Sequence, residues 1–174
     1  SQGMIFSSMQ AMNIRRIEAG IFDNGSDFDT SVSPADAGLS RFVDMDKDYF
    51  IGRQALLTRG RRHILLGVLC NGYIPEAGDL VYFKSRRVGH ITTGAYSPNF
   101  ETGIGYARLD FDESYFGCKL EVLSQDGSSY SCDTVRLPFY DREKLKPRTV
   151  TTQNPPLRAL KLNTDERETN NGAH

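Results

Sequence analysis

The hydrophobic pattern of the chain changes near Gly60, and this change constrains the fold more than any other sequence feature. Beyond Gly60, short apolar runs alternate with turn-forming sequences, which is typical of β-strands. The pair Asp126-Gly127 between two such runs is a strong signal for a β-hairpin. Short strands at this spacing predict a small antiparallel barrel or sandwich. We expect strands at residues 64–69, 80–83, 88–93, 104–107, 119–123 and 129–134.

The first 60 residues carry helical signals instead. We expect one helix over residues 7–20, a short one over 33–38, and a third that begins at Asp46 or Asp48 and ends at Gly60. Ser7 and Gln10 have the spacing of a capping box for the first of these helices. Short helices without strand partners make a poor core, so they must dock on the barrel or on sequence upstream. The predicted fold class is therefore α+β, with short helices followed by a small antiparallel β-barrel.

Composition excludes several classes of function. A formal net charge of −1 gives no general attraction to nucleic acid or to anionic lipid. No apolar run approaches the roughly 18 residues that span a bilayer, and residues 1–4 do not resemble the start of a signal peptide. We therefore expect a cytoplasmic protein with neither a nucleic-acid nor a membrane partner. The polar segment 148–174 is expected to be a poorly ordered tail.

The three cysteines, Cys70, Cys118 and Cys132, cannot all pair with one another and form no C-x-x-C unit. Without a secretion signal they are interpreted as buried thiols in a reducing compartment. They share no metal-ligand spacing with the three histidines, so no metal site is predicted.

The densest charged helical feature lies at residues 15–20. Arg16 can hold a carboxylate by two parallel hydrogen bonds, and Glu18 can accept hydrogen bonds from an amino-pyrimidine edge. The alternative is a solvated helix face with local ion pairs. Two basic clusters can likewise meet an anionic tail or a partner protein, or lie in solvated loops. These clusters are Arg59, Arg61 and Arg62, and Arg86 and Arg87.

The order of several short motifs resembles the glycine cleavage T-protein family. Residues 16–20 are similar to its R-x-E-A-G motif, and a G-x-D-x-D loop follows at 25–29. The segments 34–39, 48–56, 88–98 and 137–140 are similar to its P-x-E-A-G-L, D-F-I-G-x-x-A-L, V-G-x-V-T-S-G-x-x-S-P and L-P-F-Y motifs. The resemblance covers roughly residues 5–148.

The resemblance implies a protein of three domains around a folate site, of which this sequence holds only part. Residues 1–60 would be the helical remainder of the folate-binding domain, and 61–147 the C-terminal barrel. The family's catalytic aspartate lies in an N-terminal half that this sequence lacks, so no residue here inherits the catalytic role, and the chain alone is expected to be inactive. The implied partners are those N-terminal domains and a small methyl or aminomethyl donor. The implied cofactor is tetrahydrofolate, and its expected contacts are Arg16, Glu18, Met12 and Tyr140.

Two departures from the family pattern bear on the donor. Met12 stands where glycine-cleavage members carry the arginine of an A-R-D motif, and a family tyrosine falls near Lys144, with Tyr140 close by. These departures favour a demethylating relative, such as the dimethylsulfoniopropionate demethylase or the dimethylglycine and sarcosine oxidases. The iron–sulfur assembly branch is disfavoured because its K-G-C-Y-x-G-Q-E cysteine is missing. The alternative function is a non-catalytic folate-binding or assembly module.

Overall fold

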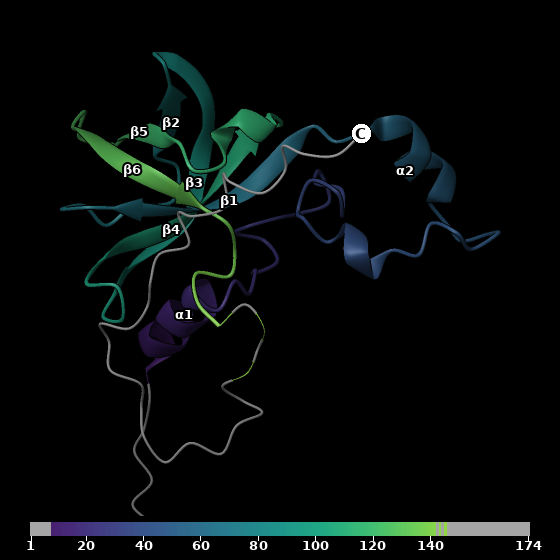
Figure 1. The fold of residues 1–174 in the computed structure, drawn as a ribbon, viewed down its shortest axis with the longest axis horizontal. Coiled ribbons are helices and arrows are strands. Elements are labelled where there is room, and N and C mark those ends of the chain that lie inside the picture. The colour runs from purple at the N-terminus through teal and green to yellow at the C-terminus, as the bar shows by residue number, and fades with distance from the viewer. Residues whose placement is uncertain (1–7, 142, 144, 146–174) are drawn as a thin grey trace, which may run out of the picture.

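Six antiparallel strands close into a barrel in the computed structural model, which describes residues 8–141, 143 and 145 (Figure 1). The strand order is β1-β4-β3-β2-β5-β6, and β6 pairs with β1 to close the circle. The predicted barrel is therefore confirmed. The tail expected at 148–174 lies outside the described residues, and the domain limits stay a prediction. The elements are α1 (Met9–Glu18), η1 (Ser40–Phe42), α2 (Arg53–Arg59), β1 (His63–Cys70), β2 (Leu80–Phe83), β3 (Arg86–Ser97), β4 (Thr102–Asp110), η2 (Glu113–Tyr115), β5 (Lys119–Leu123) and β6 (Ser129–Val135).

The predicted strands occur at the expected places, and β2 and β5 have the expected bounds. The hairpin of β3 and β4 is longer than expected because pairing extends beyond the apolar runs, up to Ser97 opposite Thr102. The turn between β5 and β6 contains Gly127 in the left-handed region, with φ of 89°. That conformation is the one that the Asp-Gly pair predicts.

Two apolar clusters stabilise the molecule. The first fills the barrel, where Leu66, Val68 and Ile91 are almost fully buried. The second lies between the outside of the barrel and α1, and it joins Ile17 to Ile104 and Tyr106. β1 is thus covered on both faces, which explains its continuous apolar sequence.

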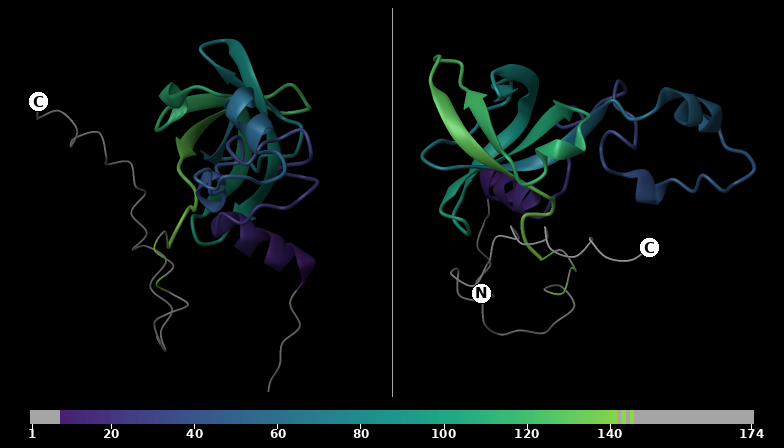
Figure 2. Two further views of the ribbon diagram at one scale, coloured as in Figure 1. Left: turned by 90° about the vertical axis from the view of Figure 1, so that its right-hand side faces the viewer. Right: turned by 45° about the horizontal axis from the view of Figure 1, so that its top comes forward.

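Helix α1 begins at the N-cap Ser8, whose Oγ accepts a hydrogen bond from the backbone N–H of Ala11 at 3.1 Å. The predicted cap, Ser7, lies outside the described residues. Gly20 follows the helix with φ of 68°, as expected for a helix end. Ile17 is fully buried, whereas Met9 and Met12 are 77% and 58% exposed, so α1 packs on the barrel along one edge. In Figures 1 and 2, α1 lies beside the barrel, and no other described element covers the face of α1 that points away from the barrel.

The prediction of a helix at residues 33–38 is wrong, because the structure has a turn there. The Ser33 hydroxyl accepts a hydrogen bond from Asp36 N–H, and the Asp36 carboxylate accepts one from Ser33 N–H. The other Asp36 oxygen accepts from the N–H groups of Arg62 and His63 at 2.7 and 3.0 Å. The buried Asp36 thus ties the turn to the beginning of β1, and no further helical turn is built.

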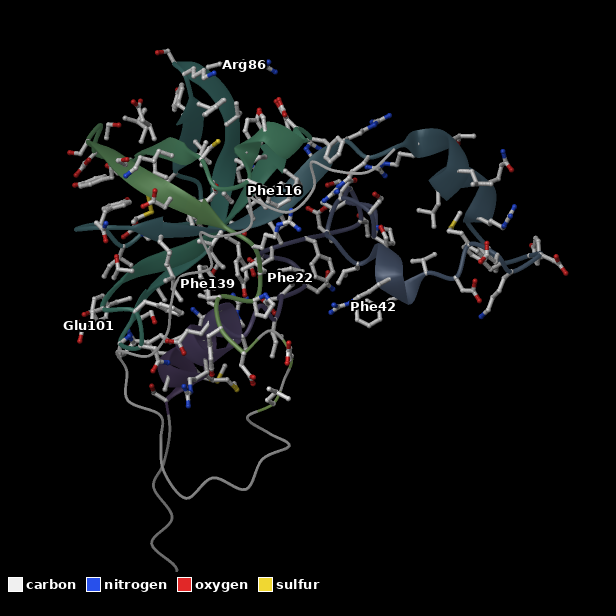
Figure 3. All side chains as sticks on the ribbon, in the orientation of Figure 1. Phe22, Phe42, Arg86, Glu101, Phe116 and Phe139 are labelled. Carbon is white, nitrogen blue, oxygen red and sulfur yellow. A yellow bond between two sulfur atoms is a disulfide. The ribbon has the colours of Figure 1, made fainter. Side chains whose placement is uncertain are left out.

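The third predicted helix begins later than expected. Gly52 has φ of 92°, a left-handed conformation that separates the preceding turns from α2, which starts at Arg53. The helix ends at Gly60, as predicted. Residues 39–60, called the arm here, extend away from the barrel in Figures 1 and 2 and carry Phe42, labelled in Figure 3, at 70% exposure. No helix in the described part of the chain has the length and apolar character to span a bilayer.

The structure corrects the interpretation of the cysteines. Cys70 of β1 and Cys132 of β6 lie directly opposite each other and form a disulfide. Cys118 is a half-buried free thiol. The prediction of thiols was wrong for the first two, because 62 residues separate them and only closure of the barrel brings them together.

Candidate functional site

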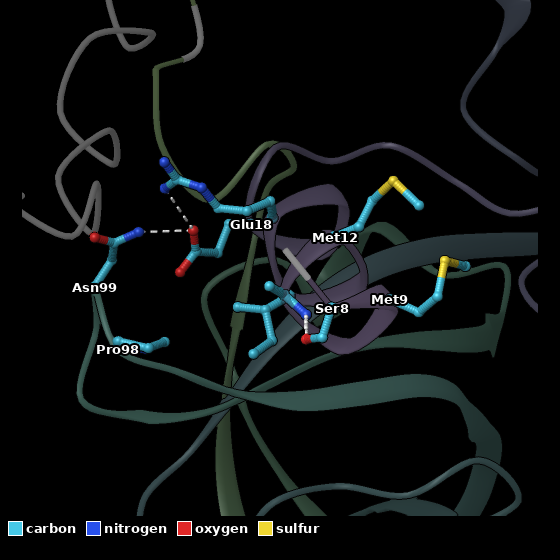
Figure 4. A pocket seen from close by; sticks show the side chains of 9 residues that line it. Ser8, Met9, Met12, Glu18, Pro98 and Asn99 are labelled. Atoms are coloured by element: carbon cyan, nitrogen blue, oxygen red, sulfur yellow. Dashed lines mark hydrogen bonds and ion pairs between the residues drawn. The ribbon is translucent and has the colours of Figure 1, made fainter. Parts of the chain in front are cut away.

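A cavity of about 670 Å³ lies between α1 and the turn that connects β3 to β4 (Figure 4). Two of the predicted site residues, Met12 and Glu18, line it, whereas Arg16 and Tyr140 do not. The structure therefore brings only half of the predicted set together. The lining residues are Ser8, Met9, Ala11, Met12, Ile14, Arg15, Glu18, Pro98 and Asn99.

Glu18 is the buried charged group of this cavity, with no exposed surface. Its Oε1 accepts a hydrogen bond from the Ser97 hydroxyl at 2.5 Å, and its Oε2 accepts one from Asn99 Nδ2 at 2.7 Å. Arg15 Nη1 lies 3.6 Å from the same Oε2. Figure 4 shows the contact between Glu18 and Asn99, whose side chains face each other. A carboxylate has about four acceptor positions, so Glu18 can accept a further hydrogen bond. Because the side chain is fully buried, a neighbouring side chain must first move aside before a molecule in the cavity reaches it.

The two methionines give the cavity an adaptable apolar wall. Met9 and Met12 stand on the exposed face of α1, and Figure 4 shows both side chains extending from the helix on the side away from Glu18. Flexible thioether side chains adapt to flat ligands of varied shape. The cavity thus combines an apolar wall with a buried hydrogen-bond acceptor, a combination that suits a flat ligand with N–H donors.

Arg16 lies on the same helix but faces the barrel. Its Nη1 donates to Asp27 Oδ2 at 2.7 Å, its Nε donates to Asn13 Oδ1 at 2.7 Å, and its Nη2 donates to Thr93 Oγ1 at 3.2 Å. The carboxylate that Arg16 holds is therefore that of Asp27, which is itself buried. Its predicted contact with folate stays a prediction.

A buried tyrosine fixes α1 relative to this network. The Tyr106 hydroxyl donates to the carbonyl oxygen of Ile17 at 2.8 Å. Burial, and then the negative charge of Asp27, raise the pKa of Tyr106 well above its usual range. The phenol therefore remains a neutral donor at ordinary pH and holds the helix that carries Glu18.

Tyr140 follows the L-P-F segment on the α1 side of the barrel. Pro138 packs against Gly20, where an added Cβ would lie 2.9 Å from the Pro138 Cα. The Phe139 ring stacks on Tyr106, with 6.3 Å between centroids. Tyr140 is half-buried there, outside the cavity lining, and its predicted ligand role is untested.

Pro98 and Asn99 are not among the predicted site residues, and Pro98 enters only as the end of the motif at residues 88–98. Asn99 acts on Glu18 across 81 positions of sequence, so no local pattern reveals the contact. Within the part of the chain that the structure describes, no group of three or more histidine, cysteine, aspartate or glutamate side chains is placed to hold a metal.

Comparison with known proteins agrees with this architecture. Residues 61–141 match the glycine cleavage T-protein C-terminal barrel domain. The chain is 29% identical to an aminomethyltransferase of Lysinibacillus sphaericus over 147 residues, which is 82% of this chain and 40% of that protein. It is 30% identical to a trimethylamine-oxide aldolase of Ruegeria pomeroyi over 148 residues, which is 81% of this chain and 19% of that protein.

One solved structure has the same fold. The crystal structure of the glycine cleavage system aminomethyltransferase T from Bartonella henselae matches 75% of this chain and 38% of that chain, with a TM-score of 0.67 and 24% identity. The chain thus spans less than half the length of each of these relatives. The closed barrel at residues 61–141 is the C-terminal barrel domain of the glycine cleavage T-protein family, and the resemblance predicted from the sequence is confirmed.

Proposed function

We propose that this chain forms part of a tetrahydrofolate-dependent enzyme that transfers an aminomethyl or methyl group from a small donor. The observation that carries the proposal is the buried Glu18 carboxylate in the wall of the cavity between α1 and the β3–β4 turn. The aminomethyltransferase relative supports it, because its similarity extends over 82% of this chain and is not confined to the barrel.

The residues of the cavity suit tetrahydrofolate. The amino-pyrimidine edge of a pterin presents N–H donors, which Glu18 can accept when the Asn99 amide moves aside from its Oε2. Met9 and Met12 can pack against the flat ring. Arg15, whose side chain is 67% exposed, is available for the carboxylates of the glutamyl tail. When bound, the folate would supply the nitrogen that accepts the one-carbon unit.

We infer a small methylated donor in preference to an aminomethyl-lipoyl group. Met12 replaces the arginine of the glycine-cleavage pattern, so the exposed face of α1 offers an apolar side chain at this position. The name of one relative, trimethylamine-oxide aldolase, refers to a compound with methyl groups on nitrogen.

No residue of this chain is assigned the catalytic role. We infer that domains like those of the longer relatives complete the site, so that this chain alone binds folate weakly. Since the cavity of about 670 Å³ is only partly enclosed, we expect it to bind folate weakly.

The test uses methionine methyl resonances and a stable folate, 5-formyltetrahydrofolate. Of the four methionines, Met9 and Met12 line the cavity, whereas Met45 lines a different one in the arm. With methyl-labelled methionine, the folate should shift the Met9 and Met12 resonances at millimolar concentration and leave that of Met45 in place.

Two variants make the test specific. Glu18→Gln should weaken binding about tenfold, because the carboxylate loses a charge-assisted hydrogen bond. The matched control Glu121→Gln, an exposed position on β5, should leave binding unchanged. Equal shifts of all three methionine resonances, or none at millimolar folate, would exclude the cavity as the folate site. A submicromolar dissociation constant would contradict the inference that other domains complete it.

A further inference from the structure

A second cavity lies at the opposite end of the β3–β4 hairpin from the folate candidate. Its volume is about 360 Å³, and basic side chains from three strands line it: His63 of β1, Arg87 and His90 of β3, and Arg108 of β4. Arg86 precedes the lining residue Arg87, and Glu101 lies in the β3–β4 turn. Figure 3 shows Arg86 and Glu101 at opposite ends of the hairpin. His90 and Ser97 are seven positions apart along β3, a distance of roughly 20 Å. This cavity is therefore a separate site.

The guanidinium of Arg108 is held at the wall of this cavity. Its Nη2 lies 3.2 Å from His90 Nε2, and the arginine must be the donor because it has no acceptor. Nε2 of His90 is therefore the acceptor and carries no proton, so the imidazole is neutral. Burial, and then the charges of Arg108, Arg87 and His63, lower the pKa of His90, which agrees with this arrangement. Arg108 is half-buried, and this is its one side-chain hydrogen bond to the described residues.

The charges around the cavity are not balanced. The side chain of Arg87 makes no hydrogen bond or ion pair with any residue that the structure describes. Asp110 is the acidic residue of the lining, and it lies 3.9 Å from Arg86 and is 56% exposed. Two arginines thus face one cavity, while Asp110 pairs with Arg86. Asp29 is outside the lining but close enough to Arg108 for that charge to lower its pKa. The like charges of Arg87 and Arg108 repel each other, and an anion between them would relieve the repulsion.

We propose that this cavity binds a small ligand through a phosphate or carboxylate group, with Arg108 and Arg87 as the donors. Guanidinium groups recognise both oxyanions by paired hydrogen bonds. The volume is at the lower end of the range of small-molecule pockets, about 300–1,000 Å³, which suits a small metabolite. Ser31 and Gly89 also line the cavity, and no phenylalanine, tyrosine or tryptophan does.

The two histidines that line the cavity, His63 and His90, provide a direct readout. A titration with sodium chloride alone serves as the reference for bulk ionic effects. The full chain is titrated near neutral pH with inorganic phosphate or with succinate, at ionic strength held constant with sodium chloride. The imidazole C–H resonances are followed by NMR.

We expect the His63 and His90 resonances to shift and saturate with the anion that binds, and not with sodium chloride alone. Saturation by phosphate alone assigns a phosphate ligand, and saturation by succinate alone assigns a carboxylate. Arg108→Gln and Arg87→Gln should each weaken binding about tenfold, as expected for the loss of a charge-assisted hydrogen bond.

The matched control is Arg41→Gln, which removes the same charge from the arm, where Arg41 lies over the Phe42 ring. It should leave the dissociation constant unchanged. Arg87 is exposed, so its variant keeps the test valid if Arg108→Gln impairs folding. The proposal is overturned if neither ion gives saturating shifts, or if both arginine variants bind as tightly as the unchanged protein.

Discussion

The guanidinium of Arg16 and the carboxylate of Asp27 form a buried ion pair, with 2.7 Å between Nη1 and Oδ2. The Asp27 side chain has no exposed surface, and its other oxygen accepts a hydrogen bond from Thr92 Oγ1 at 2.9 Å. The pair thus joins α1, the loop after it and β3. Arg16, Asp27 and Thr92 give α1 a fixed place on the barrel.

Replacing Asp27 by alanine should lower the free energy of unfolding by about 3 kcal/mol, because half-buried Arg16, the Thr92 hydroxyl and the Asp23 N–H lose their acceptor. Urea denaturation measures the change. The control is Asp29→Ala, an exposed position in the same loop, for which we expect under about 1 kcal/mol. Equal losses in the two variants would show that Asp27 acts no differently from a surface aspartate.

The disulfide between Cys70 and Cys132 should stabilise the barrel by about 3–4 kcal/mol, because it closes a chain segment of 62 residues in the unfolded state. The double variant Cys70→Ser with Cys132→Ser should lose this amount in urea denaturation, and Cys118→Ser should lose much less. Alkylation in denaturant without reductant should label Cys118 alone. Labelling of all three cysteines under those conditions would contradict the disulfide.

Asp36 should make stability depend on pH. Burial alone would raise the pKa of Asp36, but hydrogen bonds from the N–H groups of His63 and Arg62 and from Ser33 lower it well below its usual range. Because the folded pKa is below the unfolded value of about 3.9, the stabilisation is complete above that pH and is lost as pH falls through the folded pKa.

The measurement compares unfolding free energies of the unchanged protein and of Asp36→Asn at neutral pH and near pH 3. The difference between the two proteins should shrink on acidification, since the asparagine variant lacks the titrating group. A difference that is the same at both pH values would rule out ionisation of Asp36 as its source.

Tyr106→Phe should cost about 1 kcal/mol, because Ile17 loses the hydrogen bond from a buried hydroxyl. Hydrogen exchange should accelerate at the amides of α1 and remain unchanged in β5, which lies away from that helix. Exchange that accelerates equally in both elements would mean that the hydroxyl stabilises the whole barrel and does not specifically position α1.

Short-range patterns determined the strands. The Asp126-Gly127 pair and the apolar runs around it predict β5 and β6, because turn-forming residues and the alternation of side chains are local properties. Gly60 likewise ended α2 where expected, with φ of 66°. Local signals failed at Ser33 and Asp36, whose hydrogen bonds are satisfied by one turn and by the N–H groups at the start of β1.

The sequence by itself determined a barrel preceded by helices and, through the order of its motifs, the resemblance to the glycine cleavage T-protein family. Only the tertiary structure decided that Glu18 accepts a hydrogen bond from Asn99, 81 positions away. It also decided that Arg16 binds Asp27 and does not line the cavity, and that Arg87 and Arg108 face another cavity. The physical reason is that such contacts depend on strand order and closure, which are set by the packing of the whole barrel and leave no periodic trace in the sequence.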